Sequence, residues 1–279
     1  MAVTLAPLDK WTLAYLAYAT PMLLAAGVRG AEAAVIAAGY GALGAFAFAA
    51  PSLRRRGGAV RFVAEFYPLM AAVGLYTAIG MANTTAGVSH DAIVQRWEEA
   101  VLGSQPSREW IRAMPFPWLS WMLHAGYLSY YFILAGAPLG LWLSGRQEGA
   151  RRVTFAMMAA FYICYAVFLA FPVAGPRYTF ALAENAATST AIAQATQRLL
   201  DNGAAWGTAF PSSHVAVSLV AAGTTLREWR ALGFPLLVAA LLLTLGTVYG
   251  QFHYAVDAIA GVALAASIVA VIAPTKISG

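Results

Sequence analysis

Long, uninterrupted apolar segments constrain the fold of this chain more than any other feature of its sequence. Apolar residues make up 61% of the 279 positions and charged residues 10%, and the apolar positions come in blocks rather than at amphipathic spacing. Eight blocks approach the about 20 residues that a helix needs to cross a bilayer. They are 11–28, 31–50, 62–82, 116–143, 153–173, 212–226, 232–251 and 254–273. We therefore predict an all-α fold, a polytopic membrane bundle of about eight transmembrane helices.

No internal repeat or low-complexity linker divides the chain, so we predict a single membrane domain over 1–279. Two long segments between the apolar blocks, 83–115 and 174–211, are predicted to lie outside the membrane on one side. The first has apolar positions at helical spacing beside charges, which is typical of an amphipathic helix on the membrane surface. The second holds an apolar stripe between Thr188 and Leu200 that could cap a site.

The positions of Lys and Arg predict how the chain crosses the membrane, because short cytoplasmic loops carry an excess of both. With the N-terminus inside, eleven of the seventeen basic residues fall on the cytoplasmic side, and the other six are spread mainly over two long, partly acidic segments. The eleven are Lys10, Arg54, Arg55, Arg56, Arg61, Arg146, Arg151, Arg152, Arg227, Arg230 and Lys276. We therefore predict a multi-pass integral membrane protein with both termini cytoplasmic.

The net charge of +5 does not indicate a nucleic-acid partner, because the basic residues follow loop sidedness rather than a stripe on one element. Cys164 is the single cysteine and lies inside an apolar block, so it forms no intrachain disulfide and is interpreted as packing. Of the four histidines, His90 and His124 belong to no motif and are interpreted as structural hydrogen-bonding residues.

The remaining two histidines each open a hydrophobic run. One ends the segment Pro211-Ser212-Ser213-His214, and the other begins His253-Tyr-Ala-Val-Asp257. The start of a helix offers unpaired backbone N–H groups and a positive dipole end, which suit a phosphate. His253 and Asp257 are four residues apart, so on a helix they share one face and the carboxylate can orient the imidazole. A neutral, oriented imidazole is a competent nucleophile. With eight spans, both histidines fall on the extracytoplasmic face.

These motifs resemble those of the type-2 phosphatidic acid phosphatase superfamily, which has a basic phosphate clamp, a Pro-Ser-Gly-His block and a final His-x-x-x-Asp. The resemblance covers roughly 165–262, with Ser213 in the place of the glycine and Phe171 to Tyr178 as a remnant of the first motif. It implies a six-helix catalytic core within 61–279, preceded by two extra N-terminal helices in 1–60.

The resemblance also implies a two-step displacement through a phosphohistidine. His253 attacks phosphorus, Asp257 holds its ring, and His214 protonates the departing oxygen and later activates the acceptor. The residues expected to bind the substrate phosphate are Arg177, Tyr178, Ser212 and Ser213. No metal and no cofactor is required by this scheme, and the expected partner is a lipid substrate, either a phospholipid or a lipid phosphate.

Two departures from the family pattern refine this hypothesis. The family places a Lys where this chain has Ala170 and an Arg where it has Thr247, which leaves Arg177 as the one evident cation. A phosphate monoester carries close to two negative charges and a diester one, so a cation-poor pocket is better matched to a diester. This favours headgroup transfer to an alcohol or ceramide acceptor, and the motifs resemble the branch of inositol phosphorylceramide synthases and sphingomyelin synthases.

Two alternatives stand beside this hypothesis. One is a lipid phosphate monoesterase acting on phosphatidic acid or an isoprenoid phosphate or diphosphate. The other is a non-catalytic lipid-binding or transport protein, which the intact His214, His253 and Asp257 disfavour.

Overall fold

The computed structural model describes residues 4–272, so Lys276 and the end of the last predicted block lie outside the described residues. Within that range the chain forms thirteen α-helices and one isolated β-bridge. The helices are α1 (Pro7–Ala25), α2 (Gly30–Leu53), α3 (Gly58–Ala86), α4 (Asp91–Leu102), α5 (Pro106–Ala113), α6 (Pro117–Leu128), α7 (Tyr130–Leu143), α8 (Gln147–Ala170), α9 (Pro176–Thr179), α10 (Ala191–Gly203), α11 (Ser213–Glu228), α12 (Arg230–Tyr249) and α13 (Ala255–Val271). The prediction of an all-α fold is confirmed.

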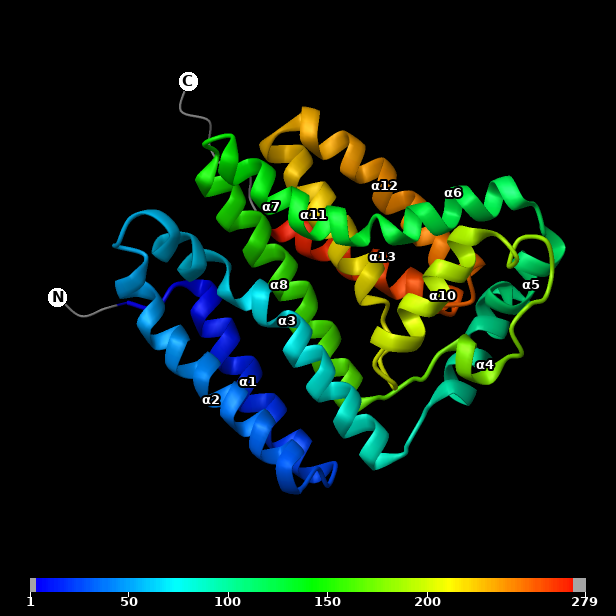
Figure 1. Cartoon of the computed structure of the whole chain (residues 1–279), viewed down its shortest axis with the longest axis horizontal. Coiled ribbons are helices and arrows are strands. Elements are labelled where there is room, and N and C mark those ends of the chain that lie inside the picture. Colours follow the sequence, from blue (N-terminus) through cyan, green and yellow to red (C-terminus); the bar gives the residue numbers. More distant parts are fainter. Residues whose placement is uncertain (1–3, 273–279) are drawn as a thin grey trace.

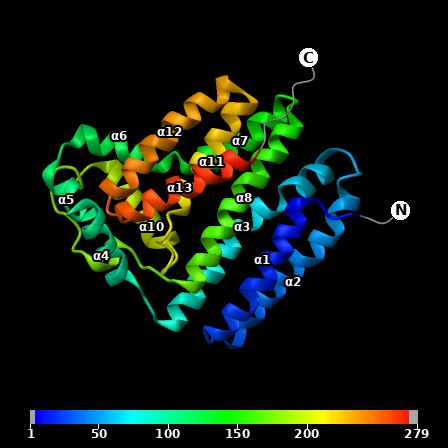
Figure 2. The same cartoon turned by 180° about the vertical axis from the view of Figure 1, so that it is seen from behind.

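Helix α8 lies in the middle of the bundle, and it packs against α1, α3, α7, α11 and α13. The α1 and α2 pair covers one flank, while α11, α12 and α13 lie on the other side of α8 (Figures 1 and 2). The short helices α4, α5 and α10 gather at one end (Figure 1). Along α8 the buried side chains are almost all apolar, as expected for a helix surrounded by other helices.

Four helices are long and apolar enough to cross a membrane, namely α2, α3, α8 and α12. Length and composition therefore do not support the predicted count of eight. The predicted span 116–143 is interrupted at Ser129, which separates α6 from α7. Helices α11 and α13, with 16 and 17 residues, are shorter than the about 20 residues of a perpendicular span. The chain is an integral membrane protein with several spanning helices.

Ion pairs join the helices at the end of the bundle opposite α4 and α10. The buried Asp9 carboxylate accepts hydrogen bonds of 2.6 and 2.7 Å from Arg54. Glu65 accepts one of 2.7 Å from Arg151, and its oxygen lies 3.9 Å from Arg61. These cations come from loops that the charge pattern assigned to one side, and the fold brings them together. That this side is cytoplasmic stays a prediction.

The two long segments outside the predicted spans form α4, α5, α9 and α10. Helix α4 lies where an amphipathic surface helix was predicted, but the side that it buries carries Asp91 and Glu98 as well as Val94. Trp97 and Val101, two apolar residues of this segment, are exposed. Helix α10 begins after Thr190, whose hydroxyl accepts a hydrogen bond from the Ala193 N–H and so caps the helix.

Candidate active site

Backbone hydrogen bonds bring three loops together: the one after α8, the one before α11 and the one between α12 and α13. Val173 and Thr208 form a parallel β-bridge in which the Ala209 N–H donates to the Val173 carbonyl at 2.8 Å. The Ser212 N–H donates to the Asp257 carbonyl at 3.0 Å, which attaches the start of α11 to the first turn of α13. Residues far apart in sequence therefore meet at one point.

Gly261 permits the close approach of α13 to α11. A Cβ atom at this position would lie 2.8 Å from the Ser212 carbonyl oxygen and 3.1 Å from the Val215 Cβ. The first distance is shorter than real Cβ contacts, so only glycine fits without a shift of one helix. The glycine thereby sets how closely the start of α11 can approach that of α13.

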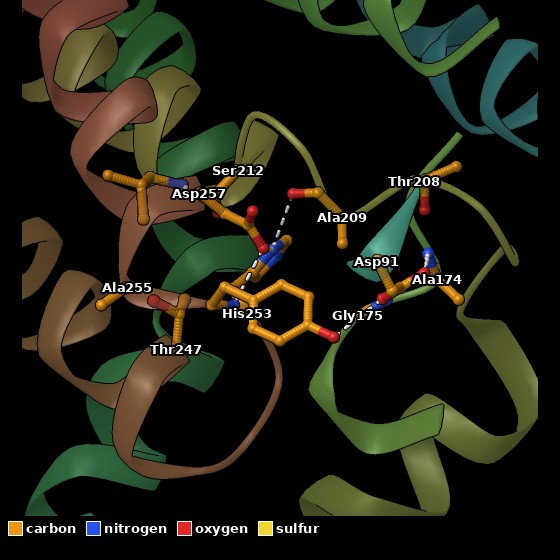
Figure 3. Close-up of polar contacts among 12 residues, drawn as sticks. Asp91, Ala174, Gly175, Thr208, Ala209, Ser212, Thr247, His253, Ala255 and Asp257 are labelled. Atoms are coloured by element: carbon orange, nitrogen blue, oxygen red, sulfur yellow. Dashed lines mark hydrogen bonds and ion pairs between the residues drawn. The ribbon is translucent and has the colours of Figure 1, made fainter. Parts of the chain in front are cut away.

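His253 lies in the loop between α12 and α13 and is 5% exposed. Its Nδ1 lies 2.9 Å from the Ala209 carbonyl oxygen and 3.5 Å from Oδ2 of Asp257 (Figure 3). Because a carbonyl oxygen only accepts, the shorter contact assigns the proton to Nδ1 and leaves Nε2 as the free nitrogen. Asp257 Oδ2 also accepts from the Tyr254 N–H at 2.9 Å and so caps α13. The ring is thus held by a backbone carbonyl that the motif spacing could not reveal, with the carboxylate farther away.

His214 stands in the first turn of α11, and its ring faces that of His253 with 5.7 Å between the centroids. Its Nε2 lies 3.5 Å from the Tyr127 hydroxyl, while its Nδ1 is buried without a hydrogen-bond partner. Tyr127 and Tyr130 pack against the imidazole. An unpaired nitrogen in a buried site is costly unless a ligand or water satisfies it.

The two histidines line a pocket of about 40 Å³, which has room for a few water-sized groups. Of the predicted site residues, His214, His253, Arg177 and Tyr178 line this pocket together. Ser212, Ser213 and Asp257 are buried behind it. The Ser212 hydroxyl accepts from the Val215 N–H at 3.4 Å, which caps α11. A phosphate-binding role of the two serine side chains stays a prediction.

Arg177, in α9, is the one cation among the residues that line this pocket. Its Nη2 donates to Asp201 of α10 at 2.5 Å, and its guanidinium lies 5.2 Å from the centre of the Tyr178 ring. Its Nη1 is buried without a partner. Asp201 is therefore the counter-ion of the predicted phosphate clamp.

Burial lowers the pKa of His253 from 6.5 to about 4, although the Ala209 carbonyl opposes this by stabilising the protonated ring. At neutral pH the ring is uncharged and its Nε2 lone pair is available. At neutral pH the pocket therefore contains one cation, Arg177, and the neutral imidazole of His253.

Two larger grooves border this pocket. One of about 610 Å³ runs along the outer part of α3 and shares Tyr76, Ala204 and Ala205 with the pocket. The other, of about 390 Å³, shares Phe252 with it and carries polar side chains, including Gln194 and Gln197 of α10. A group bound at the histidines can therefore extend in two directions.

Several lining residues were missed by sequence reasoning. Tyr76 and Thr208 share a hydrogen bond of 3.0 Å at the pocket wall, and Tyr127 and Phe252 pack around the histidines. The aromatic residues carried only the ordinary signal of a membrane protein. His90 and His124 hydrogen-bond to the Pro172 and Ser120 carbonyls, as their structural interpretation predicts, and neither lines the pocket, although His124 lines the groove that contains Gln194. Between residues 4 and 272, no three His, Cys, Asp or Glu side chains are grouped to hold a metal ion.

A helical membrane protein with one buried and one half-buried histidine and one arginine around a small pocket fits a phosphoryl-transfer class. Comparison with known families agrees, because the PAP2 superfamily profile matches residues 92–271. The chain belongs to the PAP2 superfamily, a family of phosphatase-type enzymes that act on lipid phosphates.

Among curated proteins, the chain is similar to a PA-phosphatase related-family protein of Dictyostelium discoideum. The two are 30% identical over 109 residues, which is 37% of this chain and 20% of that protein. The matched region thus spans a fifth of the relative's length. No solved structure matches the chain.

Proposed function

We propose that this protein is a lipid phosphotransferase that moves a phospho-headgroup from a phospholipid to an alcohol or lipid acceptor through a phosphohistidine at His253. The observation that carries this proposal is the charge of the catalytic pocket. Arg177 is the one cation that lines it, and His253 is neutral near pH 7. The unpaired Nη1 of Arg177 is a donor available to a phosphate oxygen.

This charge balance favours a phosphodiester. A diester carries one negative charge, which Arg177 matches, whereas a monoester carries close to two near neutral pH. The grooves that border the pocket support the same choice, since a diester has an organic group on each side of phosphorus. Each groove can receive one of these two organic groups.

In the first step, the Nε2 lone pair of His253 attacks phosphorus and the bond from phosphorus to the lipid oxygen breaks. His214 gives its proton to that oxygen, so a lipid alcohol leaves. The bound anionic substrate stabilises the protonated form of His214 that this step requires. Arg177 and nearby backbone N–H groups hold the phosphate oxygens while charge redistributes.

In the second step, an acceptor hydroxyl gives its proton to His214 and attacks phosphorus, and the bond to His253 Nε2 breaks. The product is the acceptor carrying the phospho-headgroup. The motif Gly175-Pro176-Arg177-Tyr178 resembles that of inositol phosphorylceramide and sphingomyelin synthases, so ceramide is the first acceptor to test. We place this chemistry on the extracytoplasmic face, with both termini cytoplasmic.

A second candidate is a lipid phosphate monoesterase, in which water is the acceptor. It is favoured by the similarity to a protein whose name relates it to PA phosphatase. The same residues would act, and inorganic phosphate would be the product.

The test is a turnover assay of the detergent-solubilised protein with a chelator present. Phosphatidylinositol, phosphatidylcholine and phosphatidic acid are offered in parallel, with and without ceramide. Loss of a diester donor with formation of a new phospholipid is expected, and His253→Ala should abolish it. Release of phosphate from phosphatidic acid alone would assign the monoesterase, and a fully active His253→Ala would overturn the mechanism.

The roles of the two histidines can be separated with a p-nitrophenyl phosphodiester. Because p-nitrophenolate leaves without protonation, His214→Ala should retain much of the first-step burst on this substrate while losing turnover of natural lipids. His253→Ala should lose both. Equal loss of the burst in the two variants would contradict the assignment of His214 as the proton donor.

A further inference from the structure

Two buried carboxylates on α4 lie outside the catalytic pocket and have no role in the chemistry described above. Asp91 and Glu98 stand two turns apart on the side of the helix that faces the loops, and they are 7% and 0% exposed. Within the described part of the chain, neither forms an ion pair with Lys or Arg. A buried carboxylate without a cation is costly unless hydrogen bonds satisfy it.

Asp91 receives its hydrogen bonds from the loop that precedes Arg177. Its Oδ2 accepts from the Ala174 N–H and its Oδ1 from the Gly175 N–H, both at 2.8 Å (Figure 3). The Ser89 hydroxyl also donates to Oδ2. Gly175 is the residue before α9, so the carboxylate fixes the backbone from which Arg177 extends.

The same carboxylate also contacts the loop of the nucleophile. Oδ1 of Asp91 accepts from the hydroxyl of Tyr254, the residue after His253, at 2.9 Å. That hydroxyl lies 2.7 Å from the Thr179 hydroxyl at the end of α9 and accepts from Gln95 Nε2 at 2.9 Å. Helix α4, the Arg177 helix and the His253 loop therefore meet at one phenol oxygen.

Glu98 makes the corresponding contact at the start of α13. Its Oε1 accepts from the Ala255 N–H at 2.7 Å, one residue after Tyr254. This N–H belongs to the first turn of α13, where the helix has no internal acceptor for it. Asp91 thus contacts both the loop before Arg177 and the loop that contains His253, whereas Glu98 contacts only the chain that follows His253.

We propose that Asp91 is a positioning residue for phosphoryl transfer, with Tyr254 as its link to the nucleophile. Asp91 sets the distance between the Arg177 guanidinium and the His253 ring. Glu98 holds the start of α13 in its position relative to these two groups. This inference rests on the proposed function. A displacement of about 1 Å between reacting groups can lower a rate on the order of 100-fold, so a residue outside the pocket can have a large effect.

The first test compares Asp91→Asn with Glu99→Gln, which removes an exposed carboxylate from the same helix. The asparagine side chain offers one acceptor and one donor group, so either Ala174 or Gly175 loses its acceptor. We expect kcat/KM of Asp91→Asn to fall by about 10- to 100-fold, with weaker inhibition by orthovanadate, a phosphate-like anion that needs Arg177. Glu99→Gln should match the wild type in both measurements.

Tyr254→Phe keeps the ring and removes one hydroxyl, so it tests the link if Asp91→Asn folds poorly. Asp91→Asn and Tyr254→Phe both disrupt the same contact between residues 91 and 254. The variant that carries both changes should therefore lose little more activity than the worse single variant. Independent, multiplicative losses would overturn the link. For Glu98, Gln should retain activity because its carbonyl still accepts from Ala255, whereas Met should lose it.

A purely structural role predicts a different pattern. The folded fraction of Asp91→Asn would then have the wild-type KM and the wild-type orthovanadate affinity, measured by thermal shift, and that result would overturn the inference. If wild-type protein binds orthovanadate but turns over no lipid, the proposed function fails while binding still tests the role of Asp91. If Asp91→Asn binds orthovanadate as the wild type does, positioning fails on its own.

Discussion

The guanidinium of Arg177 donates a hydrogen bond of 2.5 Å to the carboxylate of Asp201. The predicted phosphate clamp is therefore already engaged by an acidic group from α10 in the absence of substrate. Asp201 is also held by Gln197 Nε2 at 2.8 Å, so the contact is part of the helix surface that covers the pocket. A substrate phosphate that binds Arg177 must compete with this carboxylate.

Replacement of Asp201 should strengthen phosphate binding. Because its side chain is 54% exposed, the ion pair is screened and the expected gain for Asp201→Asn is about two- to five-fold in inhibition by inorganic phosphate. Glu99→Gln, which removes an equal charge from an exposed residue of α4, is the control. Unchanged or weaker inhibition in Asp201→Asn would show that Asp201 helps to orient Arg177 rather than competing for it.

A second cation should change the preference between phosphate classes. Ala170, at the exposed C-terminal end of α8, is the position where the family pattern has a Lys. We expect Ala170→Lys to raise turnover of phosphatidic acid relative to a diester by several-fold, since about two negative charges then meet two cations. Ala170→Gln controls for side-chain length. An unchanged ratio in the two variants would argue against charge as the basis of selectivity.

Gly261→Ala should disturb the site through the packing of α13 on α11. The added Cβ would lie 2.8 Å from the Ser212 carbonyl oxygen, and such overpacking costs about 1–3 kcal/mol. We expect a lower melting temperature and a lower kcat. Gly74→Ala is the matched control, because a Cβ there has no neighbour within 4 Å and alanine favours helices. Equal melting temperatures for the two variants would contradict this account.

The depressed pKa of His253 predicts an acid limb of kcat/KM near pH 4 rather than near the 6.5 of an unperturbed histidine. It also affects stability. Below pH 6.5 His253 takes up a proton in the unfolded chain, whereas in the folded chain it does so only near pH 4. The stability that His253 contributes is therefore fully present above pH 6.5, and it is lost as the pH falls from 6.5 to 4.

The contribution of Glu98 to stability changes with pH in the opposite direction. Burial raises its pKa from 4.5 to about 7, despite the hydrogen bond from Ala255, so its contribution to stability is full below 4.5 and is lost as the pH rises to about 7. The pH profiles of His253→Gln and Glu98→Gln, each subtracted from that of the wild type, should therefore slope in opposite directions. Parallel difference profiles would contradict one of the two pKa shifts.

The sequence was sufficient to predict the parts of the structure that follow from local pattern. Each predicted apolar block lies mainly on helical structure within the described residues, and three residues assigned to the site from the family resemblance, Arg177, His214 and His253, line one pocket. The number of spanning helices was overestimated because hydropathy does not reveal a break such as that at Ser129.

Interactions between residues that are far apart along the chain could not be predicted, because they leave no local pattern in the sequence. The pairing of Arg177 with Asp201 depends on how α10 folds back over α9, and neither residue alone specifies its partner. The Ala209 carbonyl holds the His253 ring through a backbone atom, which any residue type could supply. Asp91 lies in the segment predicted to form an amphipathic surface helix, and its burial follows from a loop more than eighty residues away along the chain.

The hydrogen bond between the Ser212 N–H and the Asp257 carbonyl has a consequence for how the enzyme becomes active during its synthesis. Translation proceeds from the N-terminus, so the residues of α11 leave the ribosome before those of α13. During that interval the loop before α11 lacks its partner, and His253 has no α13 beside it to order its loop. A nascent chain therefore reaches the lipids that surround it before it can react with them.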